Sequence, residues 1–185
     1  MRYNGVDISY LGDTGFRIEQ NGFVVYLDPA KLDSDPKKAD VVLMTSDRTS
    51  LKKQKLSGLL KDDTLLLAGP SVLDEDFCEM AGADFINQRG VEIRGVPGFV
   101  SNNITKDMAV GFLITMNGVK LYHPGNTNLI PNVVDLKAEG VDIALLPDID
   151  KAAYLVKEVG PKAVIPLNGH SDKLKKVLGS SVKIL

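Results

Sequence analysis

The sequence is poor in the residues that most often bind transition metals. Its 185 residues include one cysteine, Cys78, and two histidines, His123 and His170. A lone cysteine excludes a disulfide within the chain and any zinc site built from several thiolates. Two histidines exclude every metal site that takes three or more imidazoles from one chain.

Long apolar runs and a surplus of basic charge are also missing. No run approaches the roughly 18 apolar residues of a membrane span, and the first residues lack the basic-then-apolar layout of a signal peptide. The 22 basic and 24 acidic side chains nearly balance, whereas a nucleic-acid binder needs a clustered basic surplus. We therefore expect a cytoplasmic protein without membrane or nucleic-acid partners. Its length predicts a single domain, residues 1–185.

What the sequence does contain is a pattern of short strands and helices that occurs twice. The pairs Asn21-Gly22 and Asn117-Gly118 each stand between two apolar runs, which is typical of a tight β-hairpin. Further strands are expected at 41–44, 65–68, 143–146, 163–166 and 182–185. Helices are expected at 51–60, 71–81, 131–137, 152–159 and 173–178, with Cys78 buried in the second of them. The pattern predicts two packed sheets with helices outside.

Four polar loops follow predicted strands, at the place where α/β proteins most often bind ligands. They begin at Asp28, Thr45, His123 and Asn168.

Motifs in the same order along nearly the whole chain resemble the metallo-β-lactamase superfamily, in the branch of small metal-dependent hydrolases that includes the L-ascorbate-6-phosphate lactonases. The matching segments are 10–12 (YLG), 16–19 (FRIE), 26–29 (YLDP), 39–45 (ADVVLMT), 122–127 (YHPGNT), 142–147 (DIALLP) and 162–166 (KAVIP). The resemblance implies an α/β (α+β) fold, a four-layer αββα sandwich, with the site at one edge between the sheets. At His123 it implies a supporting group rather than a metal ligand.

The metal ligands that the resemblance implies are replaced in this chain. The family signature T-H-x-H-x-D-H corresponds to residues 45–50, which read TSDRTS, and two further ligands correspond to positions 126 and 168. The substituted positions are Ser46, Arg48, Ser50, Asn126 and Asn168. Arginine keeps its proton and cannot coordinate a cation. We therefore expect no metal cofactor, although zinc is the one that the resemblance implies.

These substitutions lead to a main hypothesis of a protein with this fold that has lost its metal ligands and does not hydrolyse substrates. Its role would be structural, regulatory or ligand-binding rather than enzymatic, with no catalytic residue. The residues of this degenerate site are Asp28, Ser46, Asp47, Arg48, Ser50, His123, Asn126, Asn168 and His170.

Two alternatives stay open. In one, Arg48 binds a small phosphate or carboxylate, because a guanidinium beside a helix start favours anions. Ser46, Ser50 and Asn168 would complete this anion site. In the other, a metal-dependent hydrolase survives with ligands moved to other side chains of the same loops. Those ligands would be Asp28, Asp47, His123 and His170. The resemblance also implies a homo-oligomer.

Overall fold

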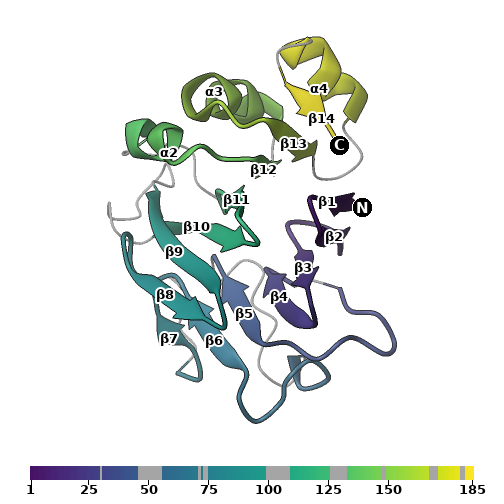
Figure 1. The fold of residues 1–185 in the computed structure, drawn as a ribbon, viewed down its shortest axis with the longest axis vertical. Coiled ribbons are helices and arrows are strands. Elements are labelled where there is room, and N and C mark those ends of the chain that lie inside the picture. Colours follow the sequence, from purple (N-terminus) through teal and green to yellow (C-terminus); the bar gives the residue numbers. More distant parts are fainter. Residues whose placement is uncertain are drawn as a thin grey trace.

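The computed structural model describes most of the chain. The described residues are 1–29, 31–45, 56–70, 72, 75–98, 109–125, 133–146, 149–166, 171–179 and 182–185. Within them two sheets of seven strands face each other, and the helices α2, α3 and α4 lie beside the second sheet (Figure 1). None of the helices in these ranges is both long and apolar enough to span a membrane.

The first sheet contains the first seven strands in sequence order. They are β1 (Arg2–Tyr3), β2 (Val6–Tyr10), β3 (Phe16–Gln20), β4 (Phe23–Leu27), β5 (Val41–Met44), β6 (Leu65–Ala68) and β7 (Cys78–Glu79). Pairing is antiparallel from β1 to β4 and parallel from β4 to β7.

The second sheet repeats this arrangement strand for strand. Its strands are β8 (Phe85–Gln88), β9 (Val91–Gly98), β10 (Ala109–Met116), β11 (Val119–His123), β12 (Ile143–Leu146), β13 (Ala163–Pro166) and β14 (Lys183–Ile184). Pairing is again antiparallel through the fourth strand and parallel beyond it. The helices are α2 (Val133–Glu139), α3 (Ile149–Val159) and α4 (Ser171–Leu178).

Both predicted hairpins are confirmed. Asn21 and Gly22 have φ angles of 48° and 78°, and Asn117 and Gly118 have 52° and 73°. Two successive positive φ angles define the turn that matches the twist of the flanking strands, and Asn-Gly adopts them at little cost. A turn of the same kind, with positive φ angles at Arg89 and Gly90, joins β8 to β9.

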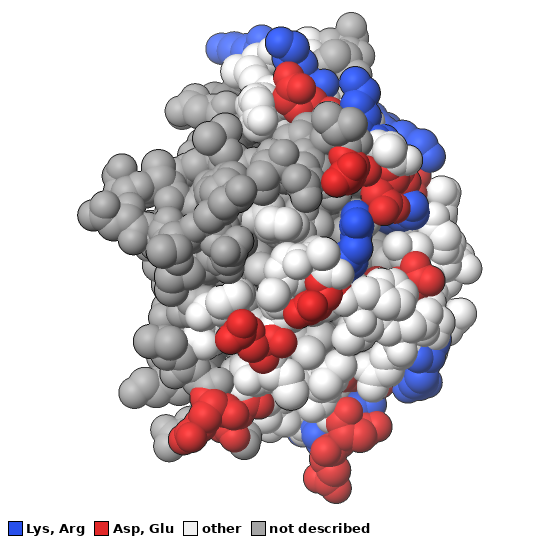
Figure 2. Space-filling view, turned by 90° about the vertical axis from the view of Figure 1, so that its left-hand side faces the viewer, with Lys and Arg blue, Asp and Glu red and all other residues white. Residues whose placement is uncertain are grey.

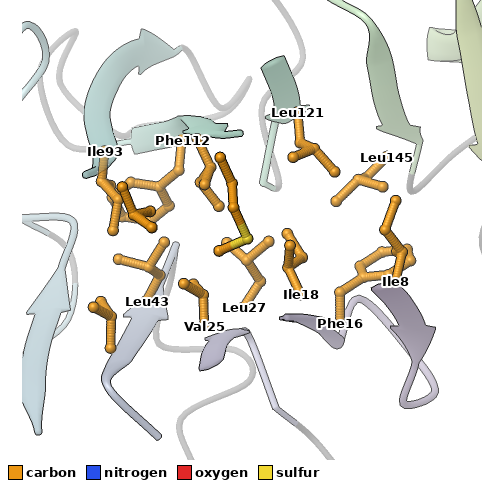
Figure 3. Close-up of a cluster of buried hydrophobic side chains, with 14 of the residues drawn as sticks. Ile8, Phe16, Ile18, Val25, Leu27, Leu43, Ile93, Phe112, Leu121 and Leu145 are labelled. Atoms are coloured by element: carbon orange, nitrogen blue, oxygen red, sulfur yellow. The ribbon is translucent and has the colours of Figure 1, made fainter. Parts of the chain in front are cut away.

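The main core lies between the two sheets (Figure 3). Ile18, Leu27 and Leu43 from the first sheet face Phe112 and Leu121 from the second, and all five are fully buried. A further cluster packs the helices onto the second sheet, and a third covers the outer side of the first sheet with Leu56 and Leu59. Apolar layers on both faces of each sheet match the predicted α/β sandwich.

The helix expected at 71–81 is wrong, because Cys78–Glu79 is a strand. Cys78 and Glu79 pair in parallel with Leu67 and Ala68 of β6, and both are exposed. Cys78 is therefore a residue of a sheet edge and not of a buried helix face. Hydrogen bonding to a neighbouring strand outweighs a local helical pattern here. The helix expected at 51–60 lies largely outside the described residues.

Candidate functional site

Asp28 is a buried carboxylate directly after β4. Its side chain is held by Thr45, which follows the neighbouring strand β5. The backbone N–H of Thr45 donates to Oδ1 at 2.7 Å, and its hydroxyl donates to Oδ2 at 2.6 Å. Both residues are almost fully buried. Hydrogen bonds to a charged acceptor of this kind compensate for the loss of hydration.

Both oxygens of the Asp28 carboxylate accept a hydrogen bond from Thr45, which fixes the orientation of the side chain. The Asp28 backbone is fixed as well, since its N–H donates to the carbonyl of Leu43 at 2.8 Å. Asp28 therefore presents a carboxylate in a defined position where loops of the two sheets meet.

His123, the last residue of β11, has both ring nitrogens in hydrogen bonds. Nδ1 accepts from the backbone N–H of Gly125 at 3.0 Å, and Nε2 lies 3.1 Å from the carbonyl oxygen of Thr14. Because Nδ1 is an acceptor, the ring proton sits on Nε2 and is donated to Thr14. Burial lowers the pKa of His123, and the negative charge of Asp28 and the bond to Thr14 oppose that shift. The ring is neutral and links the β2–β3 loop to the end of β11.

Two glycines let the strands of this region approach closely. Gly125 has a φ of 61°, and a Cβ at this position would lie 2.7 Å from Cβ of Thr45. A Cβ on Gly111 would lie 2.7 Å from the carbonyl oxygen of His123. Real Cβ atoms do not make such contacts, so a side chain at either position forces a shift. The contact between Gly125 and Thr45 brings loops of the two sheets together.

The structure thus joins Asp28 and His123 at one edge, with Thr45, Thr14 and Gly125 between them. The other predicted site residues lie outside the described ranges: Ser46, Asp47, Arg48, Ser50, Asn126, Asn168 and His170. Thr45 could have been found as the first residue of the family signature. Thr14 contributes its backbone carbonyl, which carries no signal in the sequence.

The described residues do not make a metal site by themselves. Within them no three His, Cys, Asp or Glu side chains are grouped so that they could hold an ion. Asp28 is a suitable donor, whereas His123 would have to give up a hydrogen bond to become one. A divalent ion at this edge therefore needs donors beyond the residues that the structure describes.

Comparison with known proteins identifies the family. A family model described as a beta-lactamase superfamily domain matches residues 7–168. The chain belongs to the metallo-β-lactamase superfamily. Two curated relatives carry the name UPF0173 metal-dependent hydrolase. One, from Natranaerobius thermophilus, is 23% identical over 87% of this chain and 82% of its own length. The other, from Geobacillus thermodenitrificans, is 28% identical over 87% of this chain and 84% of its own length.

Solved structures confirm the metallo-β-lactamase fold. A candidate metal-dependent hydrolase from Parabacteroides distasonis superposes with a TM-score of 0.78 at 20% identity, over 97% of this chain and 91% of that one. Igni18, a metallo hydrolase from Ignicoccus hospitalis, gives 0.74 at 17% identity, over 97% and 94%. These likenesses support the fold and, at such identities, the fold alone.

The relatives correct our main hypothesis. We expected a protein that does not hydrolyse substrates, yet proteins that align over 87% of this chain are named metal-dependent hydrolases. The error has a physical reason. Substitutions at the familiar ligand positions say nothing about other donors in the same loops, and a superfamily member can hold an ion with those.

Proposed function

We propose that this protein is a metal-dependent hydrolase of the metallo-β-lactamase superfamily whose divalent ion is held by a rearranged set of ligands. The observation that carries the proposal is the buried Asp28–Thr45 pair. A fixed carboxylate stands where loops of both sheets meet, in a chain whose relatives are named metal-dependent hydrolases.

In this proposal Asp28 is one ligand, and Asp47 and His170 supply the others. Two carboxylates and an imidazole are a donor set that binds divalent transition metals. His123 is left out of the set because both its nitrogens are engaged. The chemistry that such an ion supplies is a water acidic enough to act as a nucleophile at neutral pH.

The chain's own residues then have separate tasks. Thr45 keeps the Asp28 carboxylate in one orientation. His123 holds the β2–β3 loop and the turn at Gly125 in place and is itself sealed from solvent. In this proposal Thr45 and His123 do not touch the substrate. Both are positioning residues, because they hold other groups of the site in place.

The test is metal content and hydrolysis measured on the same preparation. The protein is purified without chelator, its metals are quantified by mass spectrometry, and lactone and phosphodiester model substrates are assayed with and without chelator. We expect a near-stoichiometric divalent metal and hydrolysis that chelator abolishes. A preparation with no metal and no hydrolysis overturns the proposal, and hydrolysis that resists chelator overturns its metal-dependence.

The variant Asp28→Asn tests whether Asp28 is a ligand of the metal. It keeps the size of the side chain and removes its charge, so we expect both the bound metal and the hydrolysis to be lost. Asp142→Asn is the matched control, a nearly buried aspartate of the second half that precedes β12 and not the candidate site. Retained metal in Asp28→Asn contradicts the assignment.

The remaining expectations stay predictions. Arg48 lies outside the described residues, so anion binding there has no structural observation in its favour. The absence of a metal cofactor, predicted from the substituted positions, is decided by the metal measurement above. A homo-oligomer, the absence of nucleic-acid and membrane partners and a cytoplasmic location are likewise for experiment.

A further inference from the structure

The strand β8 forms one edge of the second sheet. It pairs with β9 on one side, and on its other side no strand of the described ranges adjoins it (Figure 1). An edge strand presents unpaired peptide groups that a further strand can use.

The hairpin between β8 and β9 fixes which peptide groups point outward. Its two-residue turn, Arg89-Gly90, is closed by the pair Gln88 and Val91. In such a hairpin the closing pair is hydrogen-bonded and bonded pairs recur at every second residue. The hydrogen bond from the Gly95 N–H to the Asp84 carbonyl, at 2.9 Å, fits this alternation, because Asp84 lies an even number of residues before Gln88. Phe85 and Asn87 therefore turn their N–H and C=O groups away from β9.

Among the residues that the structure describes, this edge lacks the usual protection by charge. Charged side chains discourage pairing at sheet edges, and each of β1, β7 and β14 contains one charged residue: Arg2, Glu79 and Lys183. The four residues of β8 read FINQ and carry no charge. The Phe85 side chain is also 57% exposed, an unusual place for a large aromatic ring.

The surroundings of Phe85 are polar. It lines a hollow of about 210 Å³ with Arg94, Lys120 and Glu139, whose charges pair with one another. The side of the molecule that carries β8 in Figure 1 shows acidic and basic side chains without a continuous field of one sign (Figure 2). Such a surface suits a protein partner of similar character and not a membrane or a polyanion.

We propose that β8 pairs with β8 of a second copy of this chain, antiparallel and about a two-fold axis beside Ile86. In this register Phe85 of each copy exchanges peptide hydrogen bonds with Asn87 of the other, which uses the groups that point outward. A strand that pairs with itself in this way forms an isologous, closed interface. The two sheets then continue into one another.

Charges at the two ends of β8 favour the antiparallel direction. Asp84 precedes the strand, and Arg89, whose side chain contacts Asp40 but is 63% exposed, follows it. Antiparallel pairing brings the Asp84 end of one copy to the Arg89 end of the other, whereas parallel pairing sets like charges side by side. Ile86, which packs toward the core, meets its own copy at the axis. The short strand buries little area, so we expect a weak dimer.

The test is the concentration dependence of mass, measured by sedimentation velocity up to high micromolar chain, with exchange of the amide hydrogens. We expect a monomer–dimer equilibrium, and amides of Phe85 and Asn87 that gain protection only where the dimer forms. A protein that stays monomeric throughout overturns the proposal. So does a dimer in which these two amides stay unprotected.

Variants at Asn87 separate the peptide bond from the side chain. Asn87→Pro removes the outward N–H and leaves the bonds to β9 in place, since proline is tolerated where an edge N–H faces solvent. We expect its dimer dissociation constant to rise about tenfold or more. Asn87→Ala, the matched control, keeps the N–H and should still dimerise.

Phe85→Lys tests the same edge without changing the backbone. A lysine on β8 sets two positive charges beside the axis, and we expect monomers with the melting temperature of the parent. If Asn87→Pro fails to fold, as judged by circular dichroism, this variant and the exchange data decide. Dimers that persist in Phe85→Lys and in a folded Asn87→Pro overturn the proposal.

Discussion

Asp40 and Asp142 occupy equivalent positions in the two halves of the molecule, and each accepts from one backbone N–H and one lysine. The backbone N–H of Val24 donates to Oδ2 of Asp40 at 2.7 Å, and that of Lys120 donates to Oδ2 of Asp142 at 2.8 Å. Each Oδ1 accepts from a lysine, Lys61 at 2.6 Å or Lys162 at 2.7 Å. Both aspartates precede a central parallel strand, β5 or β12, and both are buried.

The repeated aspartates differ in one respect, which leads to a first prediction. Asp40 also receives Nη1 of Arg89 at 3.1 Å, so it joins the β8–β9 turn to the first sheet. We expect Asp40→Ala to lower the free energy of unfolding by about 2–3 kcal/mol, because a buried N–H loses its acceptor and a charged network is lost. Asp142→Ala should cost less. Urea unfolding of both variants measures the difference, and equal losses contradict the role of Arg89.

A second prediction concerns the hydroxyl of Thr45. Thr45→Val has nearly the same shape but cannot donate to Oδ2 of Asp28. The buried carboxylate then loses a hydrogen-bond donor, and we expect the free energy of unfolding to fall by about 1.5–3 kcal/mol. Thr45→Ser restores the donor and should lose only about 1 kcal/mol for the missing methyl group. If Thr45→Ser lowers the free energy of unfolding as much as Thr45→Val does, the hydroxyl is not what stabilises Asp28.

Gly125 supports a third prediction, with Gly22 as the matched control. Both have positive φ angles, 61° and 78°, but a Cβ at Gly22 would meet nothing within 4 Å. Gly22→Ala therefore reports the backbone strain alone, about 1 kcal/mol. Gly125→Ala adds the collision with Thr45, and we expect a total of about 2–4 kcal/mol. Thermal unfolding of the pair gives the collision by difference, and no difference means that Thr45 can move aside.

The buried His123 makes stability depend on pH. Its pKa in the folded protein is lowered by burial, so the unfolded chain takes up the proton first as pH falls. The contribution of His123 to the free energy of unfolding is complete above the pKa of histidine in the unfolded chain, about 6.5. Below that pH the contribution decreases, by up to about 1.4 kcal/mol per pH unit. We expect the free energy of unfolding, measured in urea, to fall between pH 7.5 and 5.5.

The variant His123→Asn tests that assignment. An asparagine can still accept from Gly125 but does not titrate, so the fall between pH 7.5 and 5.5 should largely disappear although the variant is less stable overall. With all proteins measured free of metal, because His170 is a proposed metal ligand, His170→Asn serves as the control and should keep the slope of the parent. A slope that survives His123→Asn and vanishes in His170→Asn assigns the titration to the other histidine.

Much of the central fold follows from local sequence. The segments 41–44 and 143–146 are uninterrupted apolar runs, as strands of a parallel layer buried on both faces must be, and both are strands with those bounds. The edge strand β14 falls within the strand expected at 182–185, but the edge strands β7 and β8 could not be predicted in this way. β7 and β8 are short and mixed in polarity, and they are strands because β6 and β9 offer them hydrogen bonds.

The site was accessible to prediction in part, for a similar reason. Asp28 and His123 stand out because they end strands whose positions are readable. The contact of His123 with Thr14 joins residues 109 positions apart through a peptide oxygen, which every residue possesses. The substituted ligand positions led to the wrong functional hypothesis. They show which metal ligands of the family are replaced, but not whether other side chains in the same loops can bind a metal.

The chain crosses from one half to the other once, between β7 and β8, and no strand pair joins the halves there. In the view of Figure 1 the N- and C-terminal ends lie on the same side of the molecule, away from this crossing. Linking these ends and reopening the polypeptide between β7 and β8 would exchange the order of the halves while every strand kept its neighbours. The molecule should therefore accept circular permutation at this crossing, since its architecture depends on which strands adjoin and not on which half is synthesised first.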